Sequence, residues 1–269
     1  MAGGCWVSSL GRFLEFSLRT PDIIESLGFY KLLGFTELEI GDVWPHKYAV
    51  VTDGVLCIGL HDAHFDEPSV TFVQQDLAKH VRSMTDHGFN FRIVKLDDDS
   101  FHQLGLDDRD GHRVTMLEAR TFTGGDEFDN DSACGTWFEL SLPSRNAVKG
   151  ARFWASVAPV MLQFREEPTT HMRFDAGGAP VGLSESIALE SPSLCFRCHD
   201  KDALFALIER HGFQYEKYPG YEGAFASLQA PEGTTLFVFD EDFLGEAYEV
   251  EESDEPAAYH GDEDSEDDD

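Results

Sequence analysis

The chain has 269 residues with 51 Asp or Glu against 20 Lys or Arg, so its formal net charge is −31 at pH 7. Nucleic-acid phosphates would repel such a chain, which argues against direct DNA or RNA binding. A hydrophobic content of 42% is enough for a packed core. No apolar run reaches the roughly 18 residues that a membrane-spanning helix needs, so a membrane partner is not expected either.

The first residues of the chain lack the basic region and the apolar stretch of a secretory signal peptide. Its five cysteines are an odd number, which without a secretion signal is typical of reduced thiols. Together these features favour a cytoplasmic protein.

The acidic residues are concentrated at the C-terminal end. Sixteen Asp or Glu and no Lys or Arg lie between Asp240 and Asp269. Such a segment cannot bury enough apolar surface to offset the entropy of ordering it. Residues 243–269 are therefore expected to form a disordered, solubilising tail, with mimicry of nucleic acid or docking to a basic partner as the alternative.

An internal repeat organises the rest of the chain. Glu15 in RFLEFSLR aligns with Glu139 in TWFELSLP, a shift of 124, and the shift stays between 122 and 124 through five segments in the same order. Such a period indicates two copies of one structural unit. We expect a first module at 10–120, a linker rich in Gly, Asp and Ser at 121–134, and a second module at 135–242.

The first elements of each module follow from its residue pattern. Alternation predicts a strand on which Leu14, Phe16 and Leu18 face a helix while Phe13, Glu15 and Ser17 face the other way. Thr20-Pro21-Asp22 then predicts a helix start, with Thr20 as the N-cap. An apolar stripe from 23 to 33 predicts the helix, and Gly34 ends it.

A β-rich stretch follows the helix and is split by Asp53-Gly54, a strong hairpin signal. After it come a strand at 70–73, a helix at 76–85, and a last strand at 114–117 behind the turn 108–111. The second module repeats this order.

This order resembles the module of the vicinal-oxygen-chelate superfamily, which includes glyoxalases, bleomycin-resistance proteins and extradiol dioxygenases. The matching features are the helix end FYKLLGF at 29–35, the Asp-Gly hairpin, the His-Gly-Phe at 87–89 and the closing Asp-x-Asp-Gly turn. They cover 12–118 and, more weakly, 136–240. The resemblance implies an α+β fold of two tandem modules, each with two βαβββ units that form a curled mixed sheet. Helices would lie on the outer face and a cavity on the concave face.

The same resemblance places metal ligands at three positions of each module. They correspond to Glu15, Ser69 and Thr115 in the first module and to Glu139, Ser193 and Phe237 in the second. Only the two glutamates are good ligands for a divalent metal. No cofactor is therefore expected, with Glu15 and Glu139 as weak metal ligands and a divalent metal as the alternative.

The candidate ligand-binding residues are those expected on the concave faces: Phe13, Glu15, Ser17, Tyr48, Ser69, Arg113 and Thr115, and then Trp137, Glu139, Ser141, His171, Ser193 and Phe237. A half-buried carboxylate must be paired, protonated or solvated by a pocket. The two glutamates could bind a cationic or hydroxylated small molecule, or one could act as a general base. Alternatively, Glu15 pairs with Arg113 and Glu139 with Arg197.

Several other residues suggest chemistry. Cys195-Phe196-Arg197-Cys198-His199 matches the haem-attachment string, but on a strand its two thiols would point to opposite faces, so neither haem nor zinc is expected. His46, His61, His64 and His171 lie near the central strands, where one could act as an acid, a base or a metal ligand.

Three functions remain open at this point. The first is a metal-free small-molecule binding protein that resembles the bleomycin-resistance group. The second is a divalent-metal-dependent lyase, isomerase or dioxygenase of the same superfamily. The third is an interaction protein that acts through its acidic tail. The modules are expected to pair either within a monomer or across a homodimer.

Overall fold

The computed structural model describes residues 9–40, 46–63, 68–97, 102–119, 132–219 and 224–241. Its first half contains β1 Arg12–Arg19, α1 Ile23–Leu32, β2 Thr36–Glu37, β3 Tyr48–Thr52, β4 Cys57–His61, β5 Ser69–Gln74, α2 Leu77–Asp86, β6 Ile93–Lys95, β7 Gln103–Asp107 and β8 Arg113–Glu118. Its second half contains β9 Thr136–Pro143, α3 Ala147–Val157, β10 Val160–Arg165, β11 His171–Ala176, β12 Ala179–Ser184, β13 Ser193–Cys198, α4 Lys201–His211, β14 Tyr215–Lys217, β15 Phe225–Gln229 and β16 Thr235–Asp240.

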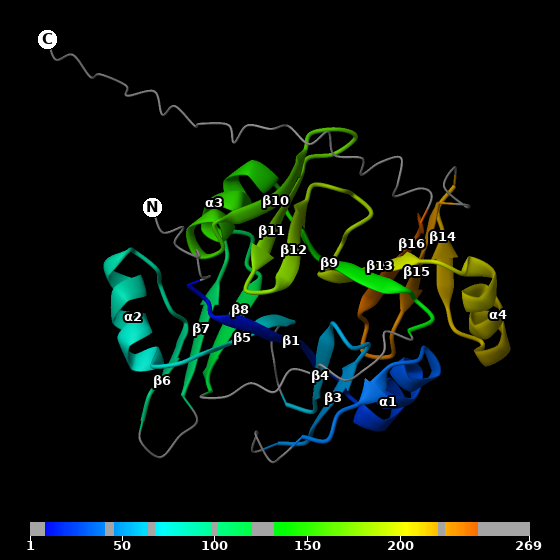
Figure 1. Ribbon diagram of the computed structural model, residues 1–269, viewed down its shortest axis with the longest axis horizontal. Coiled ribbons are helices and arrows are strands. Elements are labelled where there is room, and N and C mark those ends of the chain that lie inside the picture. Colours follow the sequence, from blue (N-terminus) through cyan, green and yellow to red (C-terminus); the bar gives the residue numbers. More distant parts are fainter. Residues whose placement is uncertain are drawn as a thin grey trace, which may run out of the picture.

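Each half forms one eight-stranded mixed sheet (Figure 1). The strand order is β2-β3-β4-β1-β5-β8-β7-β6 in the first sheet and β10-β11-β12-β9-β13-β16-β15-β14 in the second. The two orders are identical when the elements are matched, and the four helices lie on the outside of the sheets (Figure 1). The predicted α+β fold of two βαβββ-repeat modules is therefore confirmed. None of the described helices is long and apolar enough to cross a membrane. The expected linker at 121–134 lies mostly, and the expected tail at 243–269 entirely, outside the described residues.

The start of α1 differs from the prediction. Asp22, not Thr20, is the N-cap, and its side chain accepts hydrogen bonds from the backbone N–H groups of Ile24 and Glu25 at 2.9 and 3.2 Å. The Thr20 hydroxyl lies 2.9 Å from the Ser26 hydroxyl. Both residues are good caps, and because Pro21 precedes the first helical turn here, the cap falls on the residue after it.

A β-bulge corrects the predicted faces of the first strand in each module. On β1 the pairing with β5 shifts between Phe13 and Glu15, so Phe13 pairs with Phe72 while Phe16 pairs with Val70. The extra residue turns Phe13 to the core face. The expectation that Phe13 and Trp137 line the concave faces is therefore wrong. The two rings stack on each other in the core, with centroids 6.0 Å apart.

The two modules pack together within the one chain through nearly equivalent contacts. The backbone N–H of Ser9 donates to the Val157 carbonyl at 2.9 Å, and 124 residues later that of Ala133 donates to the Leu33 carbonyl at 2.8 Å. The ring of Phe29 on α1 packs on Phe213 of the second module. Helix α1 therefore lies beside the second half of the other module, as Figure 1 shows.

Side chains of the first and third helices repeat this equivalence. The Tyr30 hydroxyl donates to Glu232 at 2.6 Å, and the Trp154 indole N–H donates to Asp108 at 3.1 Å. Both aromatic residues are fully buried. Each module thus covers the first helix of the other with its closing turn, so the two sheets form one packed unit.

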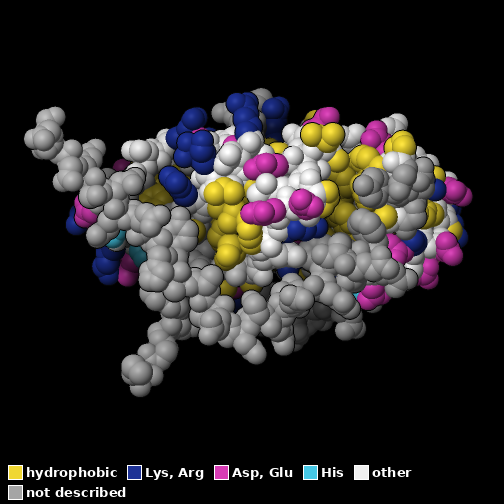
Figure 2. Space-filling view, turned by 90° about the horizontal axis from the view of Figure 1, so that it is seen from above, with side chains coloured by type: hydrophobic (Ala, Val, Ile, Leu, Met, Phe, Trp, Pro, Cys, Tyr) yellow, Lys and Arg dark blue, Asp and Glu magenta, His cyan; other side chains and the backbone are white. Residues whose placement is uncertain are grey.

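Figure 2 shows one face of this unit. Lys and Arg side chains gather along one edge of this view, while Asp and Glu side chains are scattered over the rest of the visible described surface. Some basic side chains are therefore grouped at the surface even though the chain as a whole is strongly acidic.

Candidate functional site

Glu15 is the centre of a buried polar cluster on the concave face of the first module. Its side chain is 1% exposed. The Ser17 hydroxyl donates to its Oε1 at 2.7 Å, His61 Nε2 lies 3.2 Å from the same oxygen, and the Tyr48 hydroxyl donates to Oε2. His46 Nε2 lies 2.9 Å from His61 Nδ1, so a hydrogen-bonded series runs from His46 through His61 to the carboxylate. Burial and the neighbouring His61 lower the pKa of His46.

Glu139 occupies the equivalent position in the second module and is equally buried. The Ser141 hydroxyl donates to Oε1 at 2.7 Å, as Ser17 does in the first module, and His171 Nε2 lies 2.9 Å from Oε2. His171 stands on β11 where Tyr48 stands on β3. The two modules thus hold the same carboxylate with different partners.

A glycine in the neighbouring strand makes room for each carboxyl group. A Cβ built on Gly59 would lie 2.2 Å from Glu15 Oε1, and one built on Gly182 would lie 2.3 Å from the carboxyl carbon of Glu139. Such distances are far inside van der Waals contact, so each carboxylate lies directly against the backbone of β4 or β12. A glycine inside a strand often marks such a close approach.

The predicted arginine partners are replaced by histidines. Arg113 forms an ion pair with Asp107 and not with Glu15. The ion-pair partner of Glu139 is His171 and not Arg197. Each glutamate therefore has an internal basic partner as expected, but this partner is a histidine and not the arginine that strand parity suggested. Of the other histidines considered, His64 lies outside the described residues.

The remaining positions assigned to metal ligands hold side chains that do not suit a metal. In the first module the Ser69 and Thr115 hydroxyls lie 2.7 Å apart and bond each other. In the second module the Ser193 hydroxyl donates to the Ser191 carbonyl at 2.8 Å, and Phe237 carries no ligand atom. Across the described ranges, no three His, Cys, Asp or Glu side chains are grouped so that they could hold a metal ion. These donor sets do not fit the divalent-metal site that the resemblance implies.

The concave face of the second module carries an aromatic pocket instead. Phe237, Leu189 and Cys195 form a buried cluster, against which Phe138, Tyr218, Phe225 and Phe239 pack. Beside it is a cavity of about 930 Å³ whose lining includes Phe237, Tyr218, Ser193, Ser227 and Thr235. The volume lies within the range of small-molecule sites, and so does the mixture of aromatic rings and hydroxyls.

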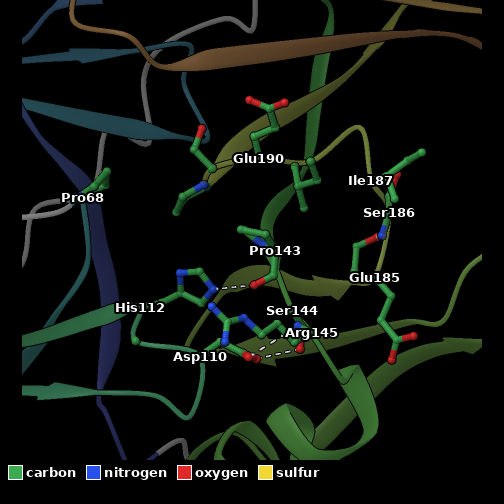
Figure 3. Close-up of a pocket in the computed structure, with 15 residues that line it drawn as sticks. Pro68, Asp110, His112, Pro143, Ser144, Arg145, Glu185, Ser186, Ile187 and Glu190 are labelled. Carbon is green, nitrogen blue, oxygen red and sulfur yellow. Dashed lines mark hydrogen bonds between the residues drawn. The ribbon is translucent and has the colours of Figure 1, made fainter.

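A second cavity of about 570 Å³ lies where the two modules meet. Figure 3 shows the polar side chains on its walls. His112 Nε2 donates to the Pro143 carbonyl at 2.7 Å, and the Ser144 hydroxyl donates to Asp110 at 2.6 Å (Figure 3). Because these groups already bond across the junction, their arrangement is explained by packing of the modules.

The described cysteines are free thiols. Cys195 belongs to the aromatic cluster and Cys198 to the main core, as strand alternation predicts. Burial raises the pKa of Cys57 to about 11 and that of Cys134 to about 12, and burial together with the Glu139 charge raises the pKa of Cys195. A thiol that stays protonated is a poor nucleophile and a poor metal ligand.

Sequence reasoning missed several residues of the second module. Phe138 reaches the concave face because the bulge moves Trp137 away from it. Tyr218 lies just after β14 and Ser227 lies on β15, and their hydroxyls are 3.1 Å apart. Arg173 and His199 were also missed, and they line a third cavity together with Arg197, which the sequence had assigned to Glu139 instead. For Arg173 the available signal was strand alternation, since it lies two residues after His171 on β11.

Comparison with known proteins identifies the fold. No protein-family model matches the chain, and no curated protein sequence matches it. A crystal structure of catechol 2,3-dioxygenase matches with a TM-score of 0.57 and 11% identity, covering 87% of this chain and 88% of that one. The 2,2',3-trihydroxybiphenyl 1,2-dioxygenase from Sphingomonas wittichii strain RW1 matches with a TM-score of 0.54 and 15% identity, covering 87% and 91%.

A Mn(II)-bound glyoxalase from Novosphingobium aromaticivorans matches with a TM-score of 0.56 and 11% identity, covering 87% of this chain and 83% of that one. At such identities the similarity establishes the fold. Because extradiol dioxygenases and a glyoxalase share it over both modules, the predicted vicinal-oxygen-chelate fold is confirmed.

Proposed function

We propose that the protein binds a small molecule without a metal of the vicinal-oxygen-chelate type, and that the ligand occupies the aromatic pocket of the second module. The observation that carries this proposal is the place of Phe237. It stands where the resemblance assigns the last metal ligand, it is 6% exposed, and it lines the cavity of about 930 Å³. An aromatic ring at this point supplies a binding surface in place of a metal ligand.

The lining of the pocket indicates the chemistry of the ligand. Aromatic rings favour a flat apolar ligand, because stacked or edge-to-face rings gain about 0.5–1.5 kcal/mol beyond the area they bury. The hydroxyls of Ser193, Ser227 and Tyr218 offer hydrogen bonds to a polar substituent. Glu139 is already bonded to His171 and Ser141, so the pocket favours a neutral or hydroxylated aromatic compound over a cation.

Binding of the neutral fluorescent probe 2-naphthol tests this proposal. Phe237→Ala is expected to weaken 2-naphthol binding about tenfold or more, because a buried Phe side chain contributes about 1.5–3 kcal/mol. Phe164→Ala is the matched control, since Phe164 lies exposed on β10 and is expected to leave binding unchanged. Equal binding by the wild type and Phe237→Ala would contradict the proposal, as would no binding at all.

A divalent-metal-dependent lyase, isomerase or dioxygenase is the second candidate. It is favoured by the similarity in fold to two dioxygenases and to a glyoxalase that holds Mn(II). In such an enzyme Glu139 would bind the metal, because it is the only one of the three ligand positions of the second module that holds a suitable side chain. The candidate is disfavoured by the Ser and Phe side chains at the other two positions.

Metal analysis separates the two candidates. We expect purified protein, incubated with Fe(II), Mn(II) or Zn(II) and then desalted, to retain well under one ion per chain, because two of the three ligand positions lack a suitable donor. One retained equivalent that is lost in Glu139→Ala but kept in His199→Gln would support the enzyme instead. His199 is the matched control, because its ion pair with Glu241 lies at the surface.

A further inference from the structure

A cavity of about 310 Å³ on the second module shares no lining residue with the aromatic pocket. Two arginines and one histidine line it, namely Arg173 on β11, Arg197 on β13 and His199 just after β13. Its apolar walls are Phe138, Leu162 and Pro180. Three basic side chains thus meet in one small cavity of a chain whose net charge is −31.

The cavity opens on the same face of the sheet as Glu139. Arg173 is two residues from His171, which bonds Glu139, and Arg197 is two residues from Cys195, which pairs with Glu139 across the strands. Residues two apart on a strand share a face. Arg197 is also four residues, or about 13 Å, from Ser193 of the aromatic pocket. The two cavities are therefore different sites on one surface.

The basic cavity is a property of the second module alone. The positions equivalent to Arg173 and Arg197 in the first module are Val50 on β3 and Val73 on β5. The fold does not need basic side chains at these two positions, because the first sheet forms the same strand order with valines there. The arginines therefore call for an explanation other than folding.

Arg197 is held in a way that favours an anionic ligand. Its Nε atom is buried and has no hydrogen-bond partner among the described residues. A buried donor left without a partner is unfavourable, and two guanidinium groups around one small cavity repel each other. A carboxylate between them would remove both penalties, since its two oxygens match the planar guanidinium group.

We propose that this cavity is a carboxylate-binding site, with Arg173 and Arg197 as the groups that bind the carboxylate. The walls of Phe138, Leu162 and Pro180 suit a carboxylate that is attached to an apolar body. Such a group can come from a free aromatic or aliphatic acid, or from the acidic residues 242–269 of the same chain. The second source is within reach, because Glu241, the last described residue, bonds His199 at 2.8 Å.

Calorimetric titration with phenylacetate and hexanoate tests the site and separates the two sources. One protein is the full chain, and the other is the full chain with every Asp and Glu from 242 to 269 replaced by Asn or Gln. Arg197→Gln and Arg173→Gln are expected to weaken binding by about tenfold to a hundredfold, because a hydrogen bond to a charged group contributes roughly 1.5–3 kcal/mol. Arg82→Gln on α2 removes the same charge at an exposed position and serves as the matched control.

Binding by the full chain, weakened by Arg197→Gln, supports a free acid as the ligand. Binding only by the protein with the neutral tail supports the tail carboxylates as the natural occupant of the same site. The proposal is overturned if neither protein binds either acid, or if both arginine variants bind as tightly as Arg82→Gln. Phenylacetate binding by Phe237→Ala should still depend on Arg197, whereas 2-naphthol binding should depend on Phe237 and not on Arg197, so failure of this site and failure of the aromatic pocket give different results.

Discussion

Trp154→Ala is expected to lower the free energy of unfolding by about 3–5 kcal/mol, as measured by urea denaturation followed by circular dichroism. The Trp154 side chain is fully buried between α3 and the other module. Its loss leaves a large cavity and removes the indole N–H that donates to Asp108 at 3.1 Å. Burial raises the pKa of Asp108 and the hydrogen bond from Trp154 lowers it, so the variant removes a partner that stabilises the charged form of this carboxyl group.

Two variants provide the comparison for Trp154. Trp154→Phe keeps most of the packing and loses the hydrogen bond, so a smaller loss of about 1–3 kcal/mol is expected. Val148→Ala lies on the same helix but 53% exposed, and it is expected to change stability by less than about 0.5 kcal/mol. If Trp154→Ala were no more destabilising than Val148→Ala, the packing of α3 between the two modules would be wrong.

His171→Gln is expected to destabilise the protein by roughly 3 kcal/mol, because it leaves the Glu139 carboxylate buried without its basic partner. The two side chains are 5% and 3% exposed and lie 2.9 Å apart. His199→Gln breaks a pair of the same type, with Glu241 at 2.8 Å, but there both side chains are more than half exposed. That exposed pair is expected to contribute at most about 1 kcal/mol.

Thermal and urea denaturation of the two single variants at pH 6 measure this difference. Glu139→Gln/His171→Gln should be more stable than His171→Gln alone, since the double substitution removes the unpaired carboxylate. Equal losses for His171→Gln and His199→Gln would show that Glu139 is not confined in the sheet. The proposed binding site would then lose the rigid surface on which it is built.

The fold was predictable because its signals repeat along the chain. Glu15 and Glu139 mark equivalent strands, and the shift between the copies stays almost constant across all five matched segments. The same βαβββ pattern could therefore be predicted separately in each module, from two different sets of residues. The structure confirms it with two sheets of identical strand order.

The faces of β1 and β9 could not be predicted in full, because alternation assumes an unbroken ladder. A single extra residue before Glu15 turns Phe13 into the core, and the equivalent bulge turns Trp137 inwards and Phe138 outwards. Nothing local distinguishes RFLEFSLR from a regular strand. The bulge is fixed by pairing with β5, which is distant in sequence.

The partners of the two glutamates also could not be predicted from the sequence. Strand parity made Arg113 and Arg197 suitable partners, but parity gives only the face and not the reach of a side chain. His61 arrives from β4, which pairs in parallel with β1, and His171 from β11, two strands away from β9. The strand order of the sheet decides which side chain meets the carboxylate.

Each module covers the first helix of the other module, and this arrangement has a consequence for synthesis of the chain. Tyr30 on α1 bonds Glu232, a residue 202 positions later. During translation the apolar side of this helix emerges early and has to wait for almost the whole chain before its covering surface exists. Contacts this distant in sequence slow folding, and an exposed apolar helix invites aggregation. We therefore expect the first helix to reach its buried position only after the turn around residue 232 has emerged from the ribosome.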